Sequence, residues 1–156
     1  MLVLSAAVIL PGGGLAARDG TDLPFMASMS GQGTVNLVTG QGHNQLITRA
    51  SHFGSGTLEE FSQIIPIAPG TYASFGHLTL TAADGDQMFG EATGTGLTTD
   101  GAHFTFTLHA VFTSGTGRFA DAGLAYDVTV HSTIVSVAGA IATSELEATA
   151  AGRLSN

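Results

Sequence analysis

The sequence predicts an all-β protein, a single antiparallel up-and-down barrel of about eight strands with one short helix at most. Three observations predict this class. Polar and apolar residues alternate with a period of two in the clearest segments, Thr, Val, Phe and Ile are plentiful, and glycine or Asp-Gly pairs recur between them. Of the 156 residues, 44% are hydrophobic and only 10% are charged, which indicates one folded domain rather than a disordered chain.

Alternation is clearest in residues 102–113 (AHFTFTLHAVFT), where every second residue is apolar and threonine or histidine lies between. Residues 76–82 and 126–135 repeat the pattern, so each segment is expected to have one buried and one polar face. The expected buried face comprises Phe104, Phe106, Leu108, Leu78, Leu80, Tyr126, Val128 and Val130.

The remaining strands are expected in weaker segments, namely 25–30, 33–38, 44–53, 87–93 and 136–150. Residues 58–64 (LEEFSQI) are interpreted as a short helix that ends before Pro66, with Glu59 and Glu60 facing water or capping its first turn. Consecutive strands joined by short turns favour a closed meander, and a two-sheet sandwich is the alternative.

Residues 1–17 are typical of a secretory signal peptide. MLVLSAAVIL is apolar, Pro11 and three glycines follow, and small residues lie at positions 16 and 17. We therefore expect an exported protein, secreted, periplasmic or extracellular, with its barrel domain in residues 18–156. The apolar run is too short to span a membrane, and no Lys or Arg precedes it. The alternative is an apolar N-terminal strand.

Composition excludes several function classes. The net charge is −8, and the four basic residues are all arginine, so a surface for nucleic acid or for anionic membranes is not expected. Without cysteine there is no thiol chemistry and no disulfide. No metal site and no cofactor is expected, because His77, His103, His109 and His131 fall on polar strand faces without chelating spacing.

Three ordered segments suggest a family. Residues 113–120 (TSGTGRFA), 75–80 (FGHLTL) and 22–25 (DLPF) resemble a glycine-rich turn, a strand and a strand start of the allene oxide cyclase and dirigent-like barrels. The resemblance covers roughly residues 22–152 and implies a small eight-stranded barrel with an apolar lumen. An acidic residue on the first strand contributes to catalysis in the plant cyclases, and it has no counterpart here. No catalytic residue is carried over.

The glycine-rich turn also has a physical reading. Gly115 and Gly117 allow positive φ, and Phe119 is expected to close one barrel end. Side chains that face the barrel interior could line a cavity there. The candidates are apolar positions of the expected buried face, together with three polar side chains whose strand face the sequence does not settle: Tyr126, Phe104, Phe106, Leu108, Leu78, Leu80, Arg49, Tyr72 and Glu91.

These observations predict a secreted barrel that binds one small hydrophobic molecule, oriented by one or two polar groups. The resemblance to the allene oxide cyclase-like barrels further implies a cofactor-free isomerase or cyclase activity. Two alternatives stay open: an interior that is only packed core, and a non-enzymatic structural protein that assembles with other copies by strand addition through its apolar N-terminal segment.

Overall fold

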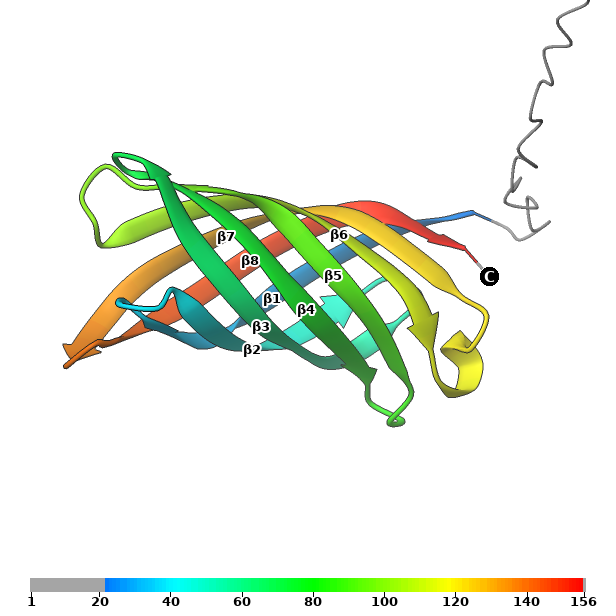
Figure 1. The fold of residues 1–156 in the computed structure, drawn as a ribbon. Coiled ribbons are helices and arrows are strands. Elements are labelled where there is room, and N and C mark those ends of the chain that lie inside the picture. The colour runs from blue at the N-terminus through cyan, green and yellow to red at the C-terminus, as the bar shows by residue number, and fades with distance from the viewer. Residues whose placement is uncertain (1–21, 156) are drawn as a thin grey trace, which may run out of the picture.

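The computed structural model describes residues 22–155. Eight antiparallel strands form a closed barrel in which each strand pairs with the next along the chain and β8 pairs with β1 (Figure 1). This confirms the predicted class. The strands are β1 (Leu23–Asn36), β2 (Gln41–Ala50), β3 (Gly54–Ala68), β4 (Thr71–Ala82), β5 (Gln87–Leu97), β6 (His103–Gly115), β7 (Gly123–Ala138) and β8 (Ile141–Ser155).

Three boundaries differ from the predicted ones. The helix expected at 58–64 is wrong, because these residues lie within β3. Segments 25–30 and 33–36 form one continuous strand, β1, and residues 37 and 38 lie in the turn that follows it. Segment 136–150 contains a hairpin turn, where Gly139 adopts a φ of +60° between β7 and β8. The predicted signal peptide, residues 1–17, lies outside the described residues.

Burial follows the alternation on β6, β4 and β7. Leu108, Ala110 and Phe112 are buried, and their neighbours His109 and Val111 are exposed. The four histidines placed on polar faces are also exposed, as expected. No helix within residues 22–155 is long and apolar enough to cross a lipid bilayer.

One end of the barrel is filled. We call it the plug end, and it carries the β2–β3, β4–β5 and β6–β7 connections. The last of these includes the 3₁₀ helix η1 (Gly117–Phe119), near the right of Figure 1. Phe119 is buried and stacks on Phe53 with ring centroids 4.9 Å apart.

The two turn glycines serve different needs. Gly117 has a φ of +52°, as expected for a residue without Cβ. Gly115 does not share this conformation. Gly115 instead lets the end of β6 lie close to the backbone of Phe119, because a Cβ at position 115 would lie 2.5 Å from the Phe119 carbonyl oxygen.

Between the plug and the middle of the barrel, the interior is a packed apolar core. Phe25, Leu80, Met88, Phe112 and Leu124 are fully buried there. Tyr126 continues this core, stacked on Phe25 at 5.4 Å and tilted against Phe112 at 5.7 Å. The expectation that the interior is only packed core therefore holds for this half of the barrel. The opposite end, where β1–β2, β3–β4, β5–β6 and β7–β8 connect, is open.

Candidate functional site

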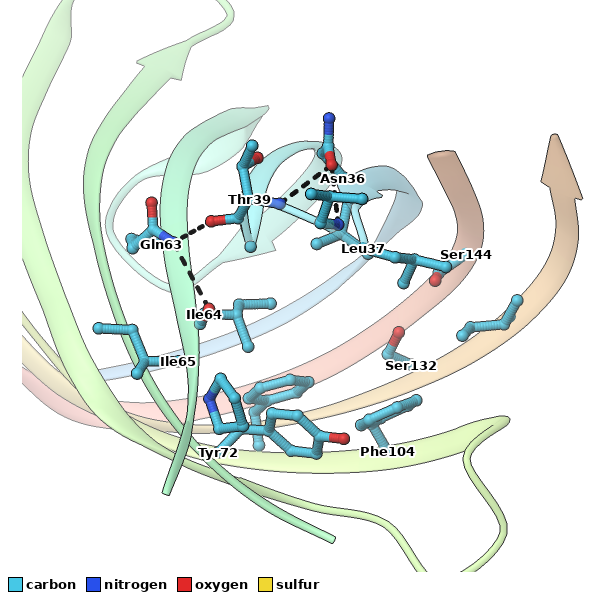
Figure 2. A pocket seen from close by; sticks show the side chains of 16 residues that line it. Asn36, Leu37, Thr39, Gln63, Ile64, Ile65, Tyr72, Phe104, Ser132 and Ser144 are labelled. Atoms are coloured by element: carbon cyan, nitrogen blue, oxygen red, sulfur yellow. Dashed lines mark hydrogen bonds between the residues drawn. The ribbon is translucent and has the colours of Figure 1, made fainter. Parts of the chain in front are cut away.

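A cavity of about 470 Å³ lies in the open end of the barrel. Such a volume lies within the range of small-molecule sites. Figure 2 shows Ile64 and Ile65 on one side, Ser132 and Ser144 on the other, and Tyr72 and Phe104 between them. The rest of the wall comes from Val35–Gly40, Gln63, Pro66, Phe106 and Ile134.

Aromatic contacts and hydrogen bonds fix the shape of this opening. Tyr72 meets Phe104 edge to face at 5.7 Å, and Phe104 stacks beside Phe106 at 6.1 Å. Asn36 Oδ1 accepts from the backbone N–H groups of residues 38 and 39, and Gln63 Nε2 donates to the Thr39 carbonyl at 2.6 Å (Figure 2). The β1–β2 turn is thus tied to β3.

A ring of polar side chains crosses the lumen below this cavity. We call it the polar belt, and it surrounds a narrower space of about 60 Å³. Because two of its serines, Ser132 and Ser144, also line the mouth cavity, the two spaces are adjacent. The belt consists of Asn44, Glu60, Ser62, Ser74, Ser132 and Ser144.

The apolar wall continues beneath the belt. A small cavity of about 30 Å³ lies there, bordered by Leu78, Leu108 and Tyr126 as well as by Asn44 and Glu60. The lumen therefore runs from an apolar mouth through a polar waist to an apolar floor, and Glu60 lies at the waist.

Glu60 is the ionisable group at the centre of the belt. Its residue is only 9% exposed, and Asn44 Nδ2 donates to its Oε2 at 2.8 Å. Burial raises the pKa of the Glu60 carboxyl, and the hydrogen bond from Asn44 only partly opposes that rise. Burial also raises the pKa of the Tyr126 hydroxyl, with the negative charge of Glu60 as a second cause.

The backbone makes room for this pair. Asn44 and Glu60 are register partners on β2 and β3, so their side chains enter the lumen side by side. Gly33 faces Asn44, and a Cβ there would lie 1.9 Å from Asn44 Oδ1. Gly76 faces Glu60, and a Cβ there would lie 3.0 Å from Glu60 Oε1. Glycine at both positions is what the polar pair requires.

The arrangement defines what the site can do chemically. Since Asn44 donates to Oε2, a neutral Glu60 carries its proton on Oε1 and can donate it to an oxygen of a guest molecule. Serine hydroxyls around the belt can donate or accept. Among residues 22–155, those that line the three cavities include no Arg, Lys or His, so a guest carboxylate would find no opposite charge among them.

The structure places seven of the nine predicted lining residues inside the barrel. Leu80 lies in the packed core rather than against a cavity. The others contact the lumen at two levels: Tyr72, Phe104 and Phe106 line the mouth, and Leu78, Leu108 and Tyr126 line the inner cavity.

Arg49 and Glu91 do not belong to the lumen, which corrects two of the predicted candidates. Both side chains point outward from the barrel. Each follows or precedes a buried residue, Thr48 or Ala92, and neighbouring residues on a strand point to opposite faces. Glu91 Oε1 lies 3.5 Å from His77 Nδ1, also on the outside.

The polar belt itself was missed from the sequence. Ser132 shares the face of Val130 and Ile134 in the predicted strand 126–135, so its inward position was available as a signal. Glu60 gave a misleading signal, because on β3 the carboxyl points inward and Phe61, 56% exposed, points outward.

Comparison with protein-family models, with curated proteins and with solved structures found no match. The fold and the lumen define the class: a closed antiparallel β-barrel, plugged at one end and open at the other, with one buried carboxyl in its waist. Within residues 22–155 every strand is paired on both sides, so the barrel offers a partner no free strand edge.

Proposed function

We propose that the protein binds one small amphiphilic molecule, apolar over most of its length, inside the open end of the barrel. The observation that carries the proposal is the buried Glu60–Asn44 pair in the polar belt, directly below the apolar mouth cavity. A buried polar pair often costs stability relative to an apolar core of the same shape, so its presence here calls for a use. Recognition of a polar group on a guest is such a use.

The order of surfaces along the lumen orients the guest. An apolar body fits the mouth, among Ile64, Tyr72 and Phe104, and a polar head group reaches the belt below. We expect a hydroxyl or carbonyl head rather than a carboxylate, because a carboxylate would face Glu60 without a cation to pair with. The serine hydroxyls complete its hydrogen bonds.

A fluorescence titration with N-phenyl-1-naphthylamine, an apolar probe that brightens out of water, tests binding in the lumen. We expect saturable binding of one probe per barrel. Ser144→Leu places an apolar side chain between mouth and belt and should weaken binding at least tenfold. The matched control is Thr149→Leu on the outer face of the same strand, which should leave binding unchanged. Equal binding by both variants would locate the probe outside the lumen and refute the proposal.

We further propose that the barrel converts its guest by isomerisation or cyclisation, in line with the resemblance to allene oxide cyclase-like barrels. Its support is the Glu60 carboxyl in an apolar site, where a raised pKa suits a proton donor. The aromatic walls would hold a flexible guest in one reactive conformer.

The chemistry can be tested without knowing the substrate. An organic extract of the source organism is incubated with protein and analysed by liquid chromatography and mass spectrometry. Isomerisation conserves mass, so the expected result is a compound that changes retention time at constant mass with the native chain and not with Glu60→Gln. If no compound shifts, or if Glu60→Gln produces the same shift, the catalytic proposal is wrong while binding can still stand.

Export remains a second, separate proposal. It is supported by the apolar residues 1–10 and the small residues that follow them. N-terminal sequencing of protein recovered outside the cytoplasm should give a chain that begins near Arg18. Recovery of the intact N-terminus from the cytoplasm alone would contradict it.

A further inference from the structure

Large apolar side chains gather around the open end of the barrel. They are at least 40% exposed, and they come from the β1–β2 turn and from the mouth ends of β3, β5, β7 and β8. We call this group the apolar rim, and it consists of Leu37, Val38, Ile65, Ile67, Leu97, Val135, Val137 and Ile141. So many exposed apolar side chains in one place mark a contact surface.

Charged side chains are concentrated at the plug end, away from the apolar rim. Within the described chain, the three arginines Arg49, Arg118 and Arg153 all belong to strand ends or connections at the plug end. At the open end, the turns and strand tips (36–41, 64–72, 97–103 and 134–142) contain a single carboxylate, Asp100, and one histidine, His103. Asp100 is already engaged, since it accepts hydrogen bonds from the backbone of His103 and from the His103 ring. The rim is therefore an apolar surface almost free of charge.

We propose that the apolar rim docks the open end of the barrel onto an uncharged lipid surface, such as a zwitterionic bilayer. The chemistry of the two surfaces matches, because the rim offers apolar side chains without cations and the chain as a whole carries a net charge of −8. The inference stands on the rim and the charge distribution, and it goes beyond the binding of a guest in the lumen.

The shape of the rim favours a lipid surface over a second copy of the chain. Stable protein interfaces have a fully packed centre, where most of the binding energy lies. The centre of this rim is the cavity mouth, so two barrels placed mouth to mouth would meet only along a ring. A fluid lipid surface adapts to a ring and needs no packed centre. Docked in this way, the cavity would open directly into lipid.

Vesicle flotation with the full chain tests the proposal, using phosphatidylcholine vesicles and the same vesicles containing phosphatidylglycerol. The rim variant is Val38→Ser/Ile67→Ser/Val137→Ser, whose three side chains are 82%, 58% and 57% exposed and hence contribute little to packing. The control variant is Met26→Ser/Ile47→Ser, which removes comparably exposed apolar side chains, 68% and 64%, from the outer wall. All the chains retain the same N-terminal residues. Circular dichroism verifies that each variant is folded.

We expect the native chain to float with phosphatidylcholine vesicles, the rim variant to partition at least tenfold less, and the wall variant to behave as the native chain. Added phosphatidylglycerol should not strengthen binding. The proposal is overturned if the native chain does not float, if the rim variant floats equally well, or if binding requires the anionic lipid. Sedimentation without vesicles provides one more outcome: a dimer that the rim variant abolishes, together with no flotation, would assign the rim to a second copy and refute lipid docking.

Discussion

Replacing Glu60 by glutamine should change how the stability of the barrel depends on pH. Glutamine has nearly the same shape, and its amide oxygen can still accept the hydrogen bond from Asn44 Nδ2. It removes only the ionisation. The variant therefore isolates the free energy associated with a buried charge at the waist of the lumen.

The sign follows from the raised pKa. In the native barrel the pKa of Glu60 lies above its value in the unfolded chain, so the folded state holds this proton more tightly. The stabilisation is complete below the unfolded pKa and is lost as the pH rises through the folded pKa. Each pH unit between the two costs the native protein about 1.4 kcal/mol relative to Glu60→Gln. For a domain of this size that corresponds to a fall in Tm of about 4–5 °C.

Thermal denaturation followed by circular dichroism from about pH 4 to pH 8 measures the effect. The two proteins should be nearly equally stable at the acidic limit, and Glu60→Gln should be the more stable above it. Glu145→Gln is the matched control, because Glu145 is exposed on the outer wall. It should track the native protein across the range. A constant difference between Glu60→Gln and the native barrel at every pH would refute the reasoning.

Three further substitutions test the packing of the site and of the plug. Asn44→Ala removes the hydrogen bond that opposes the pKa rise of Glu60. Urea denaturation should show a free energy of unfolding lower by about 1–2 kcal/mol, with a larger loss at alkaline than at acidic pH. A loss that does not depend on pH would contradict this. Gly76→Ala places a Cβ 2.9 Å from the Phe61 carbonyl oxygen and 3.0 Å from Glu60 Oε1. It should lower the free energy of unfolding by about 1–3 kcal/mol in the same assay. An unchanged denaturation midpoint would mean that the waist is packed more loosely than described. Phe119→Ala leaves Phe53 without its stacking partner and should cost about 3–5 kcal/mol by calorimetry, and a cost below 1 kcal/mol would show that the plug is dispensable.

Much of the barrel could be predicted because its strands follow a simple rule. On β6, Phe104, Phe106 and Leu108 face inward and threonines face outward, as a period of two requires. β3 was misassigned because it breaks that rule. Glu60 faces inward and Phe61 outward, so its apolar residues suggested a helical spacing. The expected number of strands nevertheless agrees, since a split β1 compensated for the missing β3.

The site was less predictable than the fold, for a physical reason. The approach of Asn44 to Glu60 depends on the register of β2 against β3, which one sequence does not encode in any short motif. Closure of the barrel then brings Ser132 and Ser144 to the same ring from the far side. The aromatic mouth was predicted in part, because Phe104 and Phe106 lie on a face defined by alternation alone.

Competition between amphiphiles of equal tail length tests the central claim most directly. Decanol and decanoate are titrated against barrel-bound N-phenyl-1-naphthylamine, with Ser144→Leu as the variant whose lumen is obstructed. The account predicts that decanol displaces the probe from the native chain at concentrations at least tenfold lower than decanoate, because Glu60 can donate to a neutral oxygen and the lining offers no cation to a carboxylate. Displacement by decanoate at equal or lower concentrations would contradict the proposed site.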